Sequence, residues 1–395
     1  MADVAPEGSF VLSEEQEEFR AVVREFADEV IGPRAAAIDE TDDYPWDLHK
    51  ALVTQGLLGV GLPEEFGGAG GGPLDVCILI EELARVSGGV SVIPLVNRLA
   101  AIPLLLAGSE AQRRDVVEGI VSGEHQWSYC LTEPGSGSDA AAMSSRAVRD
   151  PAGGWRLTGR KRFITNAGIS DRYVYFAVTD PDGEKGHNIT AFIVPGDAEG
   201  FSLGRTEHKM GIRGSPTREL ICEDVPLGDV AVIGEVHRGF QVALRTLDYA
   251  RPTVAAQAVG IAQGALDQAV KYVKEREQFG QPIGDFQGIR FMLADMVTAT
   301  EAARLLTYKA AAMVGTGDPR TGMFAAMAKT YASDTAMSVT TDAVQLLGGY
   351  GYIRDFPVER MMRDAKITQI YEGTNQIQRV VIARSLLRGR DASGR

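Results

Sequence analysis

The hydrophobic pattern of this 395-residue chain changes period twice, and that change limits the fold more than any other feature. Residues 13–122 carry apolar side chains three and four positions apart, the spacing of amphipathic helices. From residue 126 the pattern becomes short runs rich in β-branched and aromatic residues, which is typical of strands. Helical periods return after Gly239 and continue to the end. We therefore expect an all-α domain, a β domain and a second helical domain, at residues 1–125, 126–236 and 237–395.

Turn signals divide the β region. Gly153 and Gly154 precede the run 155–165, a hairpin signal, and the DPDG turn beginning at Asp180 separates two further runs. Short strands at this spacing favour an antiparallel barrel or sandwich. The long helices after Gly239 are predicted to pack as a four-helix bundle. The expected fold class is therefore α+β, mostly α.

Composition excludes several functions. A net charge of −13 argues against nucleic acid as a partner, because phosphate binding needs a basic surface. The three cysteines (Cys77, Cys130 and Cys222) are widely spaced, and the histidines are scattered, so neither a disulfide framework nor a metal site is indicated. The N-terminus is acidic, unlike a signal peptide, and no apolar run approaches the ~20 residues of a membrane span. These features predict a cytoplasmic protein without a membrane partner.

A lone carboxylate, Glu372, interrupts two helical runs near the C-terminus, in the segment QIYEGTNQIQR (369–379). Gly373 lets the chain turn, and Thr374 can cap the outgoing helix. A carboxylate on such a break points into the space between two helices, where a general base could lie. The alternative, a solvated glutamate at a helix corner, is the commoner fate of an isolated acid.

Five other segments contain candidate binding residues. The run YCLTEPGSGSD (129–139) passes from a strand into a loop whose hydroxyls and N–H groups could hold a flat cofactor or a phosphate, with a surface turn as the alternative. Asp248 and Arg251 are three apart on a predicted helix and could equally form a surface ion pair. The remaining candidates are RKRFITNAG (160–168), the arginine-containing run 276–287 and the glycine-containing run 345–351.

Together these segments, in this order, resemble the acyl-CoA dehydrogenase family over about residues 12–387, with short- and medium-chain bacterial members as the nearest type. The resemblance implies FAD as cofactor and α,β-dehydrogenation of an acyl-CoA to the trans-2-enoyl-CoA. It makes Glu372 the base that removes the α-proton, while the β-hydride passes to flavin N5. It also implies that the backbone N–H of Glu372 and a flavin ribityl hydroxyl bind the thioester carbonyl.

The resemblance also assigns binding residues. The implied flavin contacts are Tyr129, Leu131, Thr132, Ser138, Phe163, Ile164, Thr165, Arg276, Phe279, Phe286, Gln287, Gln345, Leu346, Gly348, Gly349, Thr374 and Gln376. The implied substrate contacts are Ser138, Asp248, Arg251, Tyr371 and Gly373.

Two positions bear on how closely the chain follows the family. Phe163 stands where the family usually has tryptophan, so stacking on the flavin is kept but the indole N–H is lost. Some relatives carry their base one position before the arginine that matches Arg251, and here that residue is Ala250. Glu372 is therefore the only residue that matches a family base.

The resemblance implies an electron-transferring flavoprotein as electron acceptor. It also implies a homotetramer, a dimer of dimers, because some flavin contacts come from a neighbouring subunit. Two other activities share these motifs: dehydrogenation of acyl groups on a carrier protein, and an acyl-CoA oxidase reaction with oxygen. The sequence does not fix the length or branching of the acyl chain.

Overall fold

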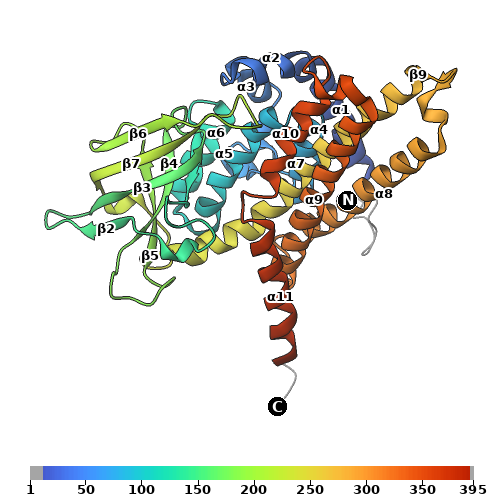
Figure 1. Cartoon of the computed structure of the whole chain (residues 1–395). Coiled ribbons are helices and arrows are strands. Elements are labelled where there is room, and N and C mark those ends of the chain that lie inside the picture. The colour runs from blue at the N-terminus through green and yellow to red at the C-terminus, as the bar shows by residue number, and fades with distance from the viewer. Residues whose placement is uncertain (1–11, 392–395) are drawn as a thin grey trace.

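The computed structural model describes residues 12–391, and its elements follow the predicted order of helices, strands and helices (Figure 1). The capping box at Ser13 and Gln16 is present and begins the first helix. That helix continues through a π-helical turn at Ala27–Ile31. The N-terminal α-helices are α1 (Glu14–Phe26), α2 (Ala35–Thr41), α3 (Trp46–Thr54), α4 (Pro73–Val86), α5 (Gly88–Ala107) and α6 (Glu110–Ser122).

The β domain consists of one eight-stranded sheet with the order β6-β7-β3-β2-β4-β5-β8, and β1 pairs with β4. Most pairs are antiparallel, including the β2–β3 hairpin expected from Gly153 and Gly154. Two pairs are parallel, because β1 and β2 both run alongside β4. The strands are β1 (Trp127–Cys130), β2 (Arg146–Arg149), β3 (Trp155–Thr165), β4 (Arg172–Val178), β5 (Ile189–Pro195), β6 (Phe201–Thr206), β7 (Thr217–Leu227) and β8 (Val232–Ile233).

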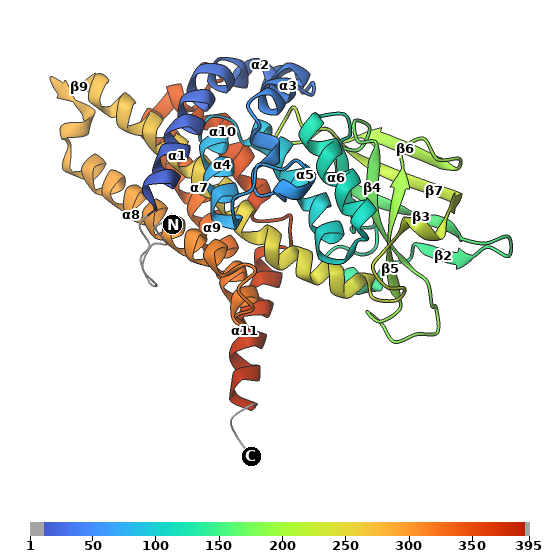
Figure 2. The ribbon, with the colours of Figure 1, turned by 180° about the vertical axis from the view of Figure 1, so that it is seen from behind.

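The C-terminal helices pack around α7, which contacts α8, α9 and α10. The same helix also packs against α4 and α5, so it joins the two helical domains (Figures 1 and 2). A two-stranded hairpin of β9 and β10 joins α7 to α8 at the end of the molecule away from the sheet. The bounds are α7 (Gly239–Glu275), β9 (Glu277–Gln278), β10 (Gln281–Pro282), α8 (Gln287–Met313), α9 (Thr321–Leu347), α10 (Val358–Thr368) and α11 (Asn375–Asp391).

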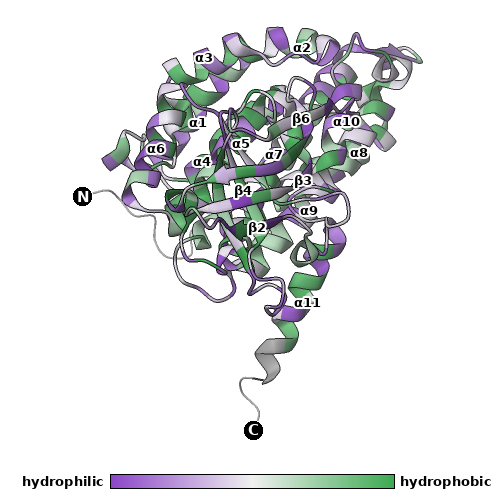
Figure 3. Cartoon of the chain, turned by 90° about the vertical axis from the view of Figure 1, so that its left-hand side faces the viewer, coloured by the Kyte–Doolittle hydropathy of each residue, from purple (hydrophilic) through white to green (hydrophobic). Residues whose placement is uncertain are grey.

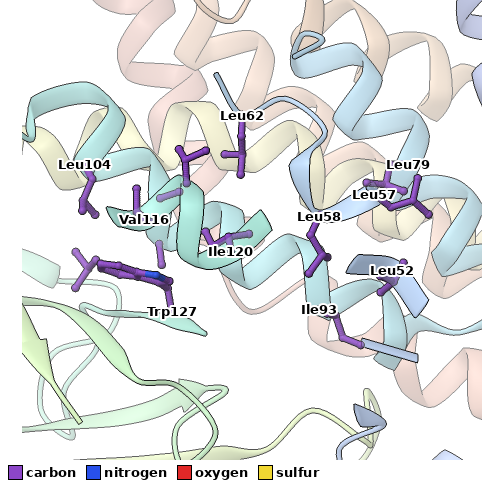
Figure 4. Close-up of a cluster of buried hydrophobic side chains, with 14 of the residues drawn as sticks. Leu52, Leu57, Leu58, Leu62, Leu79, Ile93, Leu104, Val116, Ile120 and Trp127 are labelled. Atoms are coloured by element: carbon purple, nitrogen blue, oxygen red, sulfur yellow. The ribbon is translucent and has the colours of Figure 1, made fainter. Parts of the chain in front are cut away.

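One hydrophobic cluster joins the N-terminal helices to the sheet (Figure 4). Trp127 from β1 is fully buried and lies beside α5 and α6. The central helices are largely apolar, whereas α2, α3 and α6 mix hydrophobic and hydrophilic residues (Figure 3). The labelled members of the cluster are Leu52, Leu57, Leu58, Leu62, Leu79, Ile93, Leu104, Val116, Ile120 and Trp127.

Helix α5 corrects one premise of the sequence analysis. Its 20 residues are long and apolar enough to cross a membrane, although 78% of its most apolar window is buried inside the fold. Its one buried amide, Asn97, is satisfied on both sides: it donates to Gln126 Oε1 (2.7 Å) and accepts from the Trp127 N–H (2.9 Å). The helix is therefore apolar because it lies in the core, between the other helices and β1.

Two glycines allow α7 to approach α4 closely. A Cβ added to Gly260 would lie 2.2 Å from the Glu81 carbonyl oxygen, and one added to Gly264 would lie 2.0 Å from that of Arg85. Because both obstacles are backbone atoms, no side-chain movement can relieve the clash. These two glycines set the distance between the helical domains.

We predict that Gly264→Val lowers the free energy of unfolding by about 3 kcal/mol, the upper end for overpacking a core. Urea unfolding followed by circular dichroism measures the change. Lys271→Ala, at an exposed position of the same helix, is the control and should change stability by less than about 0.5 kcal/mol. Equal stability of Gly264→Val and the control would contradict the packing argument.

Candidate active site

The chain between α10 and α11 forms a left-handed turn. Glu372 has φ 54° and Gly373 has φ 89°, so two successive residues adopt a backbone that favours glycine. Thr374 caps the next helix by accepting from the Ile377 N–H (3.3 Å), as its position in the sequence indicated. A glutamate persists in this conformation only where its surroundings hold it there.

Two side chains donate hydrogen bonds to the carbonyl oxygens of this turn. Gln378 Nε2 donates to the carbonyl oxygens of both Glu372 (3.0 Å) and Gly373 (2.9 Å). Lys329 Nζ, from α9, donates to the Gly373 carbonyl (2.8 Å) and to Asn375 Oδ1 (2.9 Å). The turn is therefore held from α9 and α11 together, which fixes the direction of the Glu372 side chain.

The Glu372 carboxylate faces an interior with few partners. Its Oε2 is shut off from solvent and has no hydrogen bond to any residue in 12–391, and the same holds for Tyr129 Oη and Arg251 Nε. Burial raises the pKa of Glu372 to about 7, although Arg251 and Lys329 oppose the shift. Glu372 also acts on the ionisation of Tyr129, so β1, α7 and the turn meet at one place. Three buried polar atoms without partners at one place define a candidate ligand site.

Two of the predicted substrate contacts are an ion pair. Arg251 donates to Asp248 Oδ1 at 2.7 Å, and the arginine is buried while the aspartate is partly exposed. Burial raises the pKa of Asp248, with Arg251 opposing the shift. Tyr371 lies next to Glu372 and donates through its hydroxyl to Gln257 Oε1 on α7. The pair thus orients Arg251 at the edge of the Glu372 site.

The two segments predicted to hold the flavin ring lie side by side. The Arg162 N–H donates to the Thr132 carbonyl (2.9 Å), and Lys161 Nζ donates to the Leu131 carbonyl (3.1 Å). Phe163, from the second segment, is 60% exposed with φ 58°. Ser138 is exposed on the loop, whereas Ile164 is buried under the sheet and Thr165 is half-buried.

A buried ion pair fixes the loop after β1. Glu133 and Lys161 are both fully buried and 2.8 Å apart. Glu133 also accepts from the Ser144 N–H (2.5 Å) and the Ser145 N–H (3.0 Å). Burial alone would raise the pKa of Glu133, but Lys161 and these hydrogen bonds lower it to about 2. Glu133 therefore ties both ends of the loop 133–145 to β3.

The remaining predicted flavin contacts lie elsewhere in the chain. Phe279, on the β9–β10 turn, is 94% exposed and 6.0 Å from Phe286 between ring centroids. The Arg276 guanidinium is 5.8 Å from the ring of Tyr350. This group occupies the end of the molecule opposite the sheet (Figures 1 and 2). Gln287, Gln345, Gly348, Gly349 and Gln376 are exposed, Thr374 is half-buried, and Leu346 packs in the bundle core.

The sequence analysis missed three residues of the site: Lys329, Gln257 and Gln378. All three are fully buried polar side chains. Lys329 had a signal, because it is a single charge among the alanines 325, 326, 328 and 332 of an apolar helix face. Burying an ammonium group is costly, so a lysine at such a position needs a specific partner.

Comparison with known proteins identifies the family. Models of the acyl-CoA dehydrogenase N-terminal, middle and C-terminal domains match residues 13–124, 128–225 and 237–387. The chain is 52% identical over 380 residues to a probable acyl-CoA dehydrogenase, FadE25, of Mycobacterium tuberculosis, covering 96% of this chain and 97% of that one. It is 44% identical over 379 residues to the CarC subunit of the caffeyl-CoA reductase–Etf complex of Acetobacterium woodii (95% and 99%).

A solved structure matches as well. Butyryl-CoA dehydrogenase from Megasphaera elsdenii superposes with a TM-score of 0.92 at 43% identity, covering 96% of this chain and 100% of that one. Fold and sequence thus define a flavoprotein oxidoreductase. The chain belongs to the acyl-CoA dehydrogenase family.

We predict that Glu133→Gln lowers the free energy of unfolding by about 3–5 kcal/mol, because it leaves the Lys161 ammonium buried without its counterion. Adding Lys161→Met should restore most of that loss, since the double variant buries no charge. Urea unfolding of both variants measures this. A single variant as stable as the native protein, or a double variant no better than the single one, would contradict the prediction.

Proposed function

We propose that this protein is an FAD-dependent acyl-CoA dehydrogenase in which Glu372 removes the α-proton of the acyl thioester. The observation that carries the proposal is the Glu372 carboxylate itself: within residues 12–391 its Oε2 is shut off from solvent without a hydrogen-bond partner, and burial raises its pKa to about 7. An acid with that pKa is ionised in part at neutral pH, yet basic enough to accept a proton from carbon. Family membership supports the reaction class.

The residues present fit a flavin. Tyr129 Oη is buried without a partner, and it lies on the strand that leads into the loop 131–138, so a polar ligand edge there would satisfy it. We assign Leu131, Thr132, Phe163, Thr165, Thr374 and Gln376 to this binding surface. Bound flavin would supply the acceptor for the β-hydride. Ser138, Ile164 and Leu346 remain assigned to the cofactor by resemblance.

The second group, at the opposite end of the chain, supports FAD in an oligomer. Arg276, Phe279, Phe286 and Gln287 lie around the β9–β10 hairpin, at the end of the molecule away from the sheet that carries Tyr129 (Figures 1 and 2). An exposed arginine beside exposed aromatics suits a pyrophosphate and an adenine ring. We propose that a neighbouring copy brings this group, with Gln345, Gly348 and Gly349, to the cofactor in a homotetramer.

Proton removal next to a thioester needs help, because the α-carbon is only weakly acidic. Within residues 12–391 the backbone N–H of Glu372 makes no hydrogen bond, so it is free to donate to the thioester carbonyl. A fixed donor at the oxygen where enolate charge develops lowers the barrier to proton removal. The same residue would then supply both the base and one donor, and the left-handed turn would set their relative directions.

The acyl chain needs an apolar surface beside this site. Leu99 and Ile102 from α5 pack with Ala250 from α7, and Tyr129 and Tyr249 lie against them. Because Ala250 and Arg251 are consecutive, this apolar surface begins where the polar site ends. We propose that the acyl chain lies here, with Asp248, Arg251, Ser138, Tyr371 and Gly373 along the thioester arm.

We further propose an electron-transferring flavoprotein as the electron acceptor, because the related CarC protein is named as part of an Etf complex. A cytoplasmic location accords with such a partner. Two assays separate the alternatives. Higher activity on carrier-bound than on CoA thioesters would favour a carrier-protein substrate, and peroxide formation matching product under air would favour an oxidase. A panel of straight, branched and aromatic acyl-CoA substrates addresses specificity.

We predict that Glu372→Gln keeps its bound flavin but loses at least about 10³-fold in kcat, the scale of general-base catalysis. The amide preserves the size of the side chain and removes only the base. Anaerobic reduction of the flavin by butyryl-CoA, followed by absorbance, measures the rate. Glu124→Gln, at an exposed position, is the control and should match the native protein. Near-native activity in Glu372→Gln would refute the assignment.

We predict that kcat/KM falls as pH decreases through about 7, because the base must be ionised and burial raises its pKa to that value. A solvated glutamate would instead give a limb near its ordinary pKa of about 4.3. Measuring kcat/KM for butyryl-CoA between pH 5 and 9 distinguishes the two. A profile that stays flat from pH 5 to 8 would show that the base is not in this environment.

A further inference from the structure

Lys329 is a fully buried cation whose direct partners are neutral. Its side chain is 0% exposed, and its ammonium donates to a backbone carbonyl and a side-chain amide oxygen, those of Gly373 and Asn375. Lys161, which is also fully buried, contacts a carboxylate directly. Taking an ammonium group out of water for two neutral acceptors is unfavourable unless a negative charge lies nearby.

The charge that lies nearby is Glu372. Its carboxylate is the largest influence opposing the effect of burial, which lowers the pKa of Lys329 to about 7. Lys329 binds the carbonyl of the residue directly after Glu372, and Glu372 Oε2 has no hydrogen-bond partner among the described residues. The cation is thus held near the base without capturing its oxygens.

The contacts of Lys329 also anchor the turn. Asn375, which accepts from Lys329, donates to Ser333 Oγ (2.8 Å) and Asp334 Oδ1 (2.8 Å), both on α9. Asn375, at the start of α11, is therefore bonded to Lys329 and, one turn further along α9, to Ser333 and Asp334. With Gln378 they satisfy the carbonyl oxygens that the left-handed backbone turns inward.

We propose that Lys329 is a positioning residue for the base, holding the Glu372–Gly373 turn in its left-handed conformation and favouring the ionised carboxylate through its own charge. This inference rests on the proposed role of Glu372. A salt bridge to Glu372 would orient the carboxylate toward the lysine, whereas a bond to the Gly373 carbonyl leaves both oxygens free for the α-proton. The arrangement stabilises the charge of the base without blocking it.

Other charged groups also act on Glu372 and Lys329. Arg251 approaches from α7 and adds a second positive charge near Glu372. Asp334, on α9, acts on Lys329 but is held by Arg379 of α11 at 2.8 Å. Tyr129 and Tyr371 are close to Glu372, and burial raises the pKa of both phenols well above the assay range. Replacing Lys329 therefore leaves Arg251 as the remaining cation beside the base.

The experiment compares Lys329→Gln, Lys329→Met and Lys329→Arg holoenzymes, with Lys50→Gln as an exposed control that removes one positive charge elsewhere. For each, the pH dependence of kcat/KM for butyryl-CoA is measured, together with flavin content and melting temperature. In Lys329→Gln and Lys329→Met, which lack the nearby cation, the midpoint of the acid side of the kcat/KM profile should move up by about one pH unit. Lys329→Arg and the control should keep the native limb.

A second readout does not depend on turnover. Under anaerobic conditions in D₂O, base-catalysed exchange places deuterium at the α-carbon of butyryl-CoA, and its rate at pH 6 should fall about tenfold in the neutral variants. Because methionine, unlike glutamine, adds no amide that needs hydrogen-bond partners when buried, Lys329→Met should fold even if Lys329→Gln does not. The proposal for Lys329 is overturned if Lys329→Gln or Lys329→Met folds, binds flavin, and shows the native pH profile and the native exchange rate, provided that Glu372→Gln is inactive. An active Glu372→Gln would instead overturn the proposed function.

Discussion

The left-handed backbone at Glu372 is the constraint on which the site depends. A glutamate keeps φ 54° only where surrounding contacts hold its backbone, and here hydrogen bonds to the carbonyl oxygens of two consecutive residues hold it. The turn directs a carboxylate inward and places buried cations nearby, and among the residues that the structure describes the N–H of Glu372 has no partner. Those three consequences are the requirements for removing a proton next to a thioester carbonyl.

The fold around this turn explains how such a site stays rigid. Helix α7 supplies Arg251, Ala250 and Gln257, and it is fixed against α4 by backbone-to-backbone contact at Gly260 and Gly264. The sheet supplies Tyr129 and the loop held by Glu133 and Lys161. The site therefore lies where all three parts of the chain meet, and small shifts of α7 would change the surroundings of Glu372, the proposed base. Phe279 is exposed at the end of the molecule away from the sheet, and we propose that it contacts the flavin of a neighbouring subunit.

Much of this could be predicted from the sequence, for physical reasons. The spacing of apolar residues predicted the order of helices and strands, because an element that buries one face carries apolar side chains at the period of that element. Gly153 and Gly154 predicted the hairpin turn after β2, but the runs of β2 and β6 were not identified, because β2 has four residues with one buried and β6 is partly exposed. Lys329, Gln257 and Gln378 were missed because of where their hydrogen-bond partners lie. The partner of Lys329 is 44 residues away, that of Gln257 is 114 residues away, and those of Gln378 are five and six residues away. Lys329 and Gln378 bind backbone carbonyl oxygens, and no motif encodes such contacts. The break at Glu372 was visible, but its left-handed conformation and buried cations were not.

The measurement that tests the central claim most directly is a crystal structure of the flavin-loaded protein with a bound acyl-CoA. The account predicts a Glu372 carboxylate oxygen about 3–3.5 Å from the α-carbon, the thioester oxygen on the Glu372 N–H, and the flavin on the opposite side of the acyl chain. A structure in which that side chain turns away from the substrate, or in which another acid lies closer to the α-carbon, would contradict it.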